Sequence, residues 1–238
     1  MKLVVTVLVV FLILAILYFI IDYFTGKAVK LTHIRKSPSK KVIGKRKLKN
    51  SNSQNFTFSV WFYVDDWSKN YGQPKPLLTA RTENGKTPLN ITMGAEVNDL
   101  DITTECYTST GQASTPGGST NSKTCTLQNF PLQKWVNLII SVYGRTLDVY
   151  IDGKLVRTCV LPGPIAVDGG LGQVVLTPAS SFTGQTADLT YWSTATNPQQ
   201  AYNIYASGFG AMGSNFFNKY KIKVAFLENG QEDWAFEI

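Results

Sequence analysis

The stretch FPLQKWVNLIISVYGRTLDVYIDGKLV, residues Phe130 to Val156, decides the fold of this chain. Apolar residues occupy every second position, at Val136, Leu138, Ile140 and Val142, and again at Leu147, Val149 and Ile151. This period of two is typical of antiparallel strands with one buried face. Gly144-Arg145 supplies a tight turn, and Asp152-Gly153 is typical of a two-residue hairpin turn, in which both central positions need positive φ. The stretch therefore predicts consecutive strands joined by hairpins.

The same alternation occurs on both sides of this stretch, first between Phe56 and Val64. Further strands are expected at residues 77–81, 89–93, 100–104, 173–176 and 187–193. One short helix is expected after Asn197 as cap and Pro198 in the first turn, ending near Ser207. The pattern predicts an all-β protein, an antiparallel β-sandwich with one short helix.

The C-terminal tail, residues 211–238, predicts an additional hairpin around Asn229-Gly230. An isolated hairpin is marginal in water, so its apolar face needs a cover. We expect a protein neighbour to provide it and the hairpin to be a docking element; the alternative is that the hairpin caps a sheet edge of its own domain. The candidate docking residues are Tyr220, Ile222, Val224, Trp234 and Phe236.

Three stretches together resemble one family. They are the opening stretch, FTFSVWFYVDDW at residues 56–67, and SFTGQTADLTYWSTATNPQQAYNIYASG at residues 181–208. In this order they resemble the concanavalin A-like lectin/glucanase superfamily, specifically its laminin G-like jelly rolls. The resemblance implies a jelly-roll domain over residues 51–210. Because that superfamily includes glycan-cleaving enzymes, lectins and structural modules, function must be argued from a site.

The N-terminal run LVVTVLVVFLILAILYFII, Leu3 to Ile21, carries no charge and is long enough to cross a hydrocarbon core as a helix. A cleaved signal peptide would have a shorter apolar region and a small-residue cleavage site, which is absent here. We therefore predict a single N-terminal transmembrane helix within residues 1–24, with the lipid bilayer as its partner.

Residues 25–50 are strongly basic, with ten cations and no acid, and we expect them to form a juxtamembrane linker. The net charge of the chain is +7, but residues 50–238 hold twelve basic and fifteen acidic side chains, a formal charge of −3. We expect the linker to contact anionic lipid headgroups; a solvated spacer is the alternative. The cations are Lys27, Lys30, Arg35, Lys36, Lys40, Lys41, Lys45, Arg46, Lys47 and Lys49.

Positive charges next to a transmembrane helix favour the cytoplasmic side, which predicts a single-pass protein with its C-terminal domain in the cytosol. Two features of the sequence are relevant to the opposite placement, with the domain outside the cytosol. Asn55 and Asn90 begin glycosylation triplets, which would matter only in a translocated domain. Three cysteines allow a Cys106–Cys125 bridge that leaves Cys159 free, or three small buried thiols.

Catalytic groups are scarce, and no enzyme activity, cofactor or metal is predicted. Retaining glucanases need an acid and a nucleophile about 5 Å apart. The nearest pattern, Asp99, Asp101 and Glu105, has too long a spacing and is better explained by exposed strand carboxylates. The single histidine, His33, lies in the basic segment. Asp152 is explained by its hairpin turn rather than by calcium. No nucleic acid is expected, because the basic run lacks interleaved aromatics.

Four aromatic residues occupy the strand positions that alternate with the core-facing residues, on the side where polar residues lie. They are candidates for stacking on sugar rings. They are Trp61, Tyr63, Tyr150 and Trp192. Packing beneath loops or the extra hairpin is the alternative.

The main functional expectation is a membrane-anchored structural or docking protein that presents a jelly roll to protein neighbours in a larger assembly. Its architecture is similar to that of membrane-attached proteins of large DNA viruses, which predicts a minor capsid or virion protein linking an inner membrane to the capsid. The alternative is a membrane-anchored glycan-binding, lectin-like module. A glycoside hydrolase is disfavoured by the missing carboxylate pair.

Overall fold

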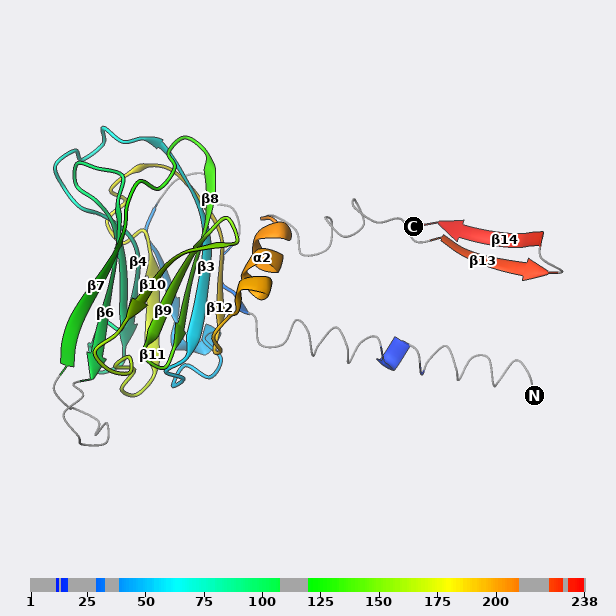
Figure 1. The fold of residues 1–238 in the computed structure, drawn as a ribbon, viewed down its shortest axis with the longest axis horizontal. Helices are drawn as coiled ribbons and strands as arrows, with labels where there is room; N and C mark the ends of the chain where they lie inside the picture. The colour runs from blue at the N-terminus through cyan, green and yellow to red at the C-terminus, as the bar shows by residue number, and fades with distance from the viewer. Residues whose placement is uncertain are drawn as a thin grey trace.

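The computed structural model describes residues 12, 14–16, 29–32, 39–107, 120–209, 223–228 and 231–237, the last two ranges through their backbone. Two six-stranded antiparallel sheets pack face to face (Figure 1). The first sheet has the order β1-β12-β3-β8-β9-β10 and the second β2-β11-β4-β5-β6-β7. The prediction of an antiparallel β-sandwich with one short helix is confirmed.

The strands of the first sheet are β1 (Val29–Lys30), β12 (Thr183–Trp192), β3 (Phe56–Asp66), β8 (Trp135–Tyr143), β9 (Thr146–Ile151) and β10 (Lys154–Val160). Those of the second sheet are β2 (Lys41–Gly44), β11 (Leu171–Leu176), β4 (Lys75–Thr82), β5 (Leu89–Met93), β6 (Leu100–Tyr107) and β7 (Thr120–Leu127). A 3-10 turn, η1 (Lys45–Lys47), follows β2. The hairpin turn between β9 and β10 has positive φ at Asp152 and Gly153, as predicted.

One core fills the space between the sheets. Strand β3 directs Phe56, Phe58 and Phe62 into it, and all three are buried. Phe62 meets Phe130 edge to face at 5.6 Å between ring centroids. The alternating apolar residues of β8 and β9 complete this core, so period two in the sequence does report the buried face.

The central part of the outer face of the first sheet is also buried, which corrects the expectation of a single buried face. Helix α2 (Pro198–Ala206) lies against this face (Figure 1). The Asn197 side chain caps it by accepting a hydrogen bond from the Gln200 backbone N–H, and the Gln200 side-chain oxygen accepts one from the Asn197 backbone N–H. Ile139 and Tyr150 pack with Ala201 in a small second core beneath the helix.

The basic segment is not a linker throughout. Val29 and Lys30 pair with β12, and β2 pairs with β11 in the register Ile43↔Val174. Ile43 and Leu48 are buried, with 2% and 4% of their surface exposed. Two apolar residues within the charged run thus anchor residues 41–48 to the sandwich. The domain boundary predicted at residue 51 is therefore too late.

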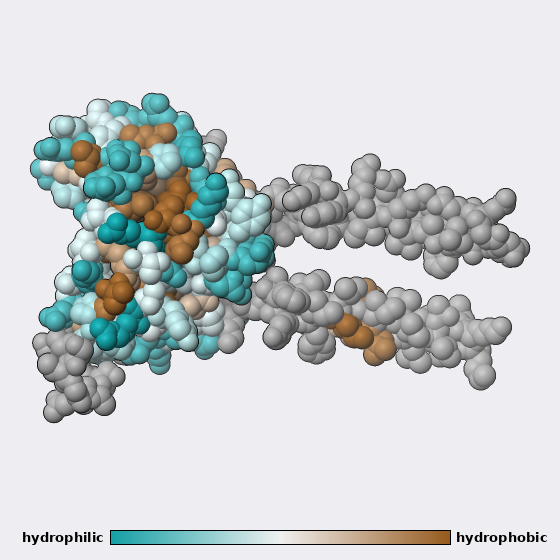
Figure 2. Space-filling view, in the orientation of Figure 1, coloured by the Kyte–Doolittle hydropathy of each residue, from teal (hydrophilic) through white to brown (hydrophobic). Residues whose placement is uncertain are grey.

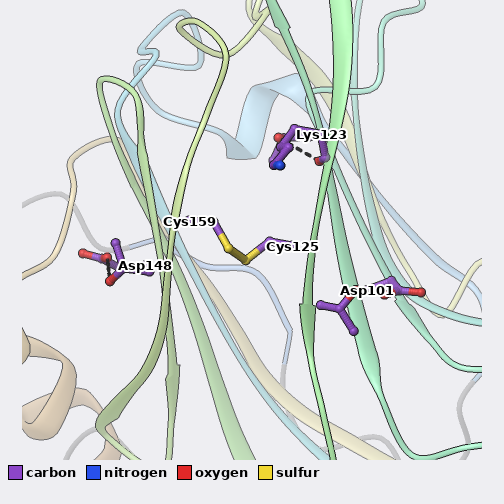
Figure 3. Close-up of a disulfide and its surroundings, with 8 residues drawn as sticks. Asp101, Lys123, Cys125, Asp148 and Cys159 are labelled. Carbon is purple, nitrogen blue, oxygen red and sulfur yellow. Dashed lines mark hydrogen bonds between the residues drawn. A yellow bond between two sulfur atoms is a disulfide. The ribbon is translucent and has the colours of Figure 1, made fainter.

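A disulfide joins Cys125 on β7 to Cys159 on β10 and connects the two sheets at their last strands (Figure 3). Cys106 is a free, buried thiol. The possible Cys106–Cys125 bridge is therefore wrong, and the alternative of three buried thiols holds only for Cys106. Those two cysteines lie on adjacent strands of one sheet, in a register that pairs Cys106 with Asn121 and Cys125 with Ile102. Sequence distance gave no indication of the partner in the opposite sheet.

The predicted C-terminal hairpin is present as β13 (Lys223–Glu228) and β14 (Gln231–Glu237), which form a two-stranded sheet of their own. At the other terminus, most of the predicted transmembrane segment lies outside the described residues. Within the described part of the chain, no helix has the length and apolar character to span a bilayer.

Candidate functional site

Polar side chains form a ladder across the outer face of the second sheet. Cross-strand register aligns Thr79 with Asn90, Asn90 with Thr103, and Thr103 with Thr124. The Thr79 hydroxyl donates to Asn90 Oδ1 at 2.7 Å, and the hydroxyls of Thr103 and Thr124 lie 3.0 Å apart. This row arises because the outward positions of β4 to β7 carry polar groups, while inward neighbours such as Ala80, Ile91 and Ile102 are apolar and buried.

A depression of about 440 Å³ lies on this face, and we call it the polar face site. Its charged members are Arg81, which is exposed, and Glu105. Glu105 Oε2 accepts a hydrogen bond of 2.8 Å from the Thr87 backbone, which holds this carboxylate at the rim of the β4–β5 turn. The site is lined by Thr79, Arg81, Thr87, Asn90, Thr103, Glu105 and Ser122.

A buried ion pair holds the same turn in place. Lys86 Nζ lies 2.7 Å from Asp168 Oδ2, and only 4% of the Asp168 side chain is exposed. The Tyr107 hydroxyl donates to the other oxygen of Asp168, and Lys86 Nζ lies 5.2 Å from the centre of the Tyr107 ring. The residue next to Thr87 is thus tied to the 161–170 loop, so the turn that borders the polar face site is preorganised.

The site offers directional hydrogen bonding. Its hydroxyls, amide, guanidinium and carboxylate present fixed donors and acceptors, as recognition of a hydroxyl-rich ligand requires. The three carboxylates considered as catalytic candidates all accept hydrogen bonds: Asp101 from the Thr126 hydroxyl at 2.6 Å, Asp99 from the Asn129 backbone at 3.0 Å, and Glu105 as described. In the described ranges, no cluster of three potential metal ligands occurs.

The aromatic residues predicted to stack on sugars lie on the first sheet, beneath or beside α2. Trp61 is 7% exposed and stacks on Tyr205 at 5.6 Å between ring centroids. Tyr150 is 1% exposed, and burial, with a smaller contribution from Asp148, raises the pKa of its hydroxyl. Tyr63 and Trp192 are half-buried. The predicted alternative, packing, describes Trp61 and Tyr150, because a helix instead of a ligand covers them.

The predicted basic contact residues separate into two groups. Lys30 pairs with Asp188 at 2.9 Å and Lys45 with Glu83 at 2.7 Å, while Lys40, Lys41, Arg46, Lys47 and Lys49 are exposed. Lys27, Arg35 and Lys36 lie outside the described residues, as do His33, Tyr220 and Ile222 of the other predictions. Val224, Trp234 and Phe236 lie on the strands of the separate hairpin.

Two predicted residues have local structural roles. Asp152 Oδ1 accepts from the Asn137 backbone at 2.9 Å and Oδ2 lies 3.2 Å from Lys134 Nζ, so its carboxylate serves the hairpin region. Asn55 Oδ1 accepts from the Gly144 backbone at 2.8 Å. Asn90, which begins the other glycosylation triplet, lies inside the polar face site.

Sequence reasoning missed the polar face site, although a signal for it was present. Residues 89–93 and 100–104 were expected to form strands, and their polar positions are Asn90, Thr92, Asp101 and Thr103. Such residues on one strand are ordinary for a solvated face. Only the register of four neighbouring strands shows that they form one array.

Comparison with known proteins agrees with this architecture. A family model described as "Concanavalin A-like lectin/glucanases superfamily" matches residues 41–202. The chain therefore belongs to this superfamily. A search of curated proteins finds no match.

The similar solved structures include binding domains of botulinum neurotoxins. The serotype D binding domain has a TM-score of 0.54 at 12% identity, over 76% of this chain and 43% of that one. The binding domain of neurotoxin DC in complex with SialylT also scores 0.54 at 12% identity, over 76% and 46%. A serotype D ligand-binding domain in complex with N-acetylneuraminic acid scores 0.52 at 13% identity, over 76% and 42%. The chain spans less than half of these proteins, and such identities show the fold alone.

Proposed function

We propose that this chain is a membrane-anchored, non-enzymatic glycan-binding module whose binding surface is the polar face site. One observation carries the proposal: α2 covers the outer face of the first sheet, whereas the second sheet presents an uncovered array of hydrogen-bonding side chains. Sugar hydroxyls act as both donors and acceptors, and they match a surface of Thr, Asn, Arg and Glu groups that are already ordered.

The comparisons support the class of ligand without identifying it. The superfamily name includes lectins, and two structural neighbours were solved with SialylT and with N-acetylneuraminic acid. Because this chain matches less than half of those proteins, their ligands do not define its own. Arg81 provides an exposed cation next to the hydroxyl ladder, so an acidic or neutral glycan is compatible with the site.

The Cys125–Cys159 bridge supports a domain in an oxidising compartment, since disulfides persist there and are rare in the cytosol. A glycan-binding module and glycosylation at Asn55 need the same placement. The charge distribution favours the cytosol instead. However, that argument counted cations that the fold itself uses, such as Lys30 in its pair with Asp188. We therefore propose the non-cytoplasmic side.

Binding of the purified full chain, solubilised in detergent, to an array of defined glycans tests the proposal. For a glycan that the unmodified chain binds, Arg81→Ala should lower the affinity by about 10- to 100-fold. This is the range expected for the loss of one hydrogen bond from a charged group. The matched control is Arg157→Ala, which removes an exposed arginine on β10. Thr103→Val and its control Thr158→Val repeat the comparison with hydroxyls. Equal losses in both members of each pair, or no binding by the unmodified chain, would refute the assignment.

A docking function is the second candidate, because β13 and β14 join neither sheet of the sandwich. We propose on this basis that the hairpin contacts a protein neighbour, as in a virion or another membrane-bound assembly. Truncation after Gly210 tests this role: it should leave a folded domain that no longer joins its assembly, with glycan binding unchanged. A truncated chain that unfolds would assign the hairpin to the core.

A further inference from the structure

Exposed cations gather along one edge of the sandwich. Strand β2, turn η1 and their flanks carry Lys40, Lys41, Arg46, Lys47 and Lys49, all exposed, and we call this set the basic edge. Within the described part of the chain, none of the five forms a salt bridge. The nearby Lys45 is paired with Glu83 at 2.7 Å, so that carboxylate is occupied.

The fold fixes the basic edge in place. Strand β2 pairs with β11 over four residues, and the Thr177 hydroxyl donates to the Ser39 carbonyl at 2.8 Å just before it. Ile43 and Leu48 point into the core on either side of η1. The five cations therefore extend from an ordered backbone instead of a flexible tether. They lose less conformational entropy on binding a surface than the same charges on a free chain would.

The topology places this edge opposite the disulfide. β7 and β10 are the last strands of their sheets, and Cys125–Cys159 joins them, so these two edges lie on one side of the sandwich. β1 and β2 are at the other ends of the same two sheets and therefore lie on the opposite side. This opposite side is also where the chain enters the domain.

The length of the chain connects this side to the predicted anchor. Seven residues, 22–28, lie between Ile21, the end of the apolar run, and Val29 in β1, so the chain takes eight steps from one to the other. Even fully extended, they span about 28 Å. A hollow of about 460 Å³ runs along residues 41–47, and the exposed Val42 borders it, with 49% of its surface accessible. Cations, an apolar side chain and a small hollow together suit the headgroup region of a bilayer.

We propose that the basic edge docks the domain onto an anionic phospholipid surface, so that the sandwich stands edge-on with β1 and β2 towards the bilayer and β7 and β10 away from it. The polar face site then opens sideways, parallel to the membrane plane. The inference is independent of the proposed glycan binding. Combined with the proposed non-cytoplasmic placement, it requires that the leaflet facing the domain on that side be anionic. Each cation near an anionic surface favours docking about fivefold.

The test uses the full chain reconstituted in nanodiscs of phosphatidylcholine, either alone or mixed with phosphatidylserine, with a quencher on the lipid headgroups. A fluorophore is attached at Val42→Cys on the near edge or at Val160→Cys, which is 71% exposed on the far edge. In anionic discs at low salt, we expect strong quenching at position 42 and little at position 160. High salt should remove the difference, because it screens exposed charges.

The decisive variant replaces Lys41, Arg46, Lys47 and Lys49 by glutamine and should lower the docked-to-undocked ratio at least about a hundredfold. Its matched control replaces Lys69, Lys123, Lys154 and Arg157, which are exposed elsewhere and change the net charge equally. The control should keep the quenching at position 42. Equal quenching of the two labels in anionic discs, or an unchanged difference in the decisive variant, would overturn the proposal. The lipid comparison in the unmodified chain remains a test even if that variant misfolds.

Discussion

The Cys125–Cys159 bridge makes a quantitative prediction about the stability of the sandwich. It closes a loop with a sequence separation of 34 residues. In the chain-entropy treatment, a loop of this length restricts the unfolded chain enough to stabilise the fold by about 4 kcal/mol. Its position strengthens the expectation, because β7 and β10 are edge strands with a neighbour on one side only. The bridge is the covalent link between the two sheets at this edge.

We therefore expect Cys125→Ser combined with Cys159→Ser to lower the free energy of unfolding by about 4 kcal/mol. For a domain of this size, the melting temperature should fall by about 8 to 16 °C. The measurement is urea unfolding followed by tryptophan fluorescence, with reducing agent added to the unmodified protein as an independent route to the same state. Cys106→Ser is the control for loss of a cysteine, since this thiol is free and buried.

The reasoning would be refuted if the double variant lost less than about 1 kcal/mol while its unfolding slope with urea stayed unchanged. In that case, the core between the sheets would hold the β7 and β10 edge without the bridge. A larger loss in Cys106→Ser than in the double variant would also contradict it. Agreement between reduction and substitution would show that the bridge forms in the purified protein, as the proposed non-cytoplasmic placement requires.

Four further predictions concern other parts of the chain. Lys75→Met should destabilise the fold by about 3 kcal/mol in urea unfolding, because the fully buried ammonium donates to the carbonyls of residues 70, 73 and 95, which would lose their partner. Burial raises the pKa of Tyr191 to about 12, so the unfolded chain ionises first and stability should fall by about 2 to 3 kcal/mol between pH 10 and 12; a pH series should show a smaller fall in Tyr191→Phe. Gly153→Ala should lower the melting temperature by several degrees, because a Cβ there would lie 2.9 Å from the Tyr205 Cβ at a positive φ of 74°. Deleting residues 1–24 should release a soluble domain, and membrane association that persists in carbonate would contradict the predicted anchor.

The sequence predicts the strands well where burial alternates. Residues 89–93 form β5 with the expected bounds, and the expected strand from Phe56 runs to Asp66 as β3. The Asn197 cap and Pro198 also locate α2 correctly, because capping chemistry is local. These features depend on near neighbours in the chain, so one sequence is enough to read them.

The errors arose where a distant partner decides the outcome. β2 was missed because lysines dominate residues 40–49, although Ile43 and Leu48 are buried. Only Ile43 and Leu48 need to be apolar, because they are the side chains that face the core. The neighbouring lysines can stay in solvent, because β2 is an edge strand. β7 was missed because its sequence, TNSKTCTL, is polar. It forms by pairing with β6, and its Cys125 faces the core opposite Cys159.

The two sheets show why the alternation of inward and outward residues along a strand is not enough to locate a binding site. Trp61 and Asn90 both occupy outward positions on central strands, and the sequence alone makes the aromatic residue the stronger binding candidate. The chain returns as α2 over the first sheet, and Gly153 permits this approach because its missing Cβ leaves room for Tyr202 and Tyr205. Trp61 becomes part of the packing, whereas Asn90 stays at an open surface. Which face remains available for binding is therefore decided by where one short helix packs, and in this chain a hairpin glycine makes that packing possible.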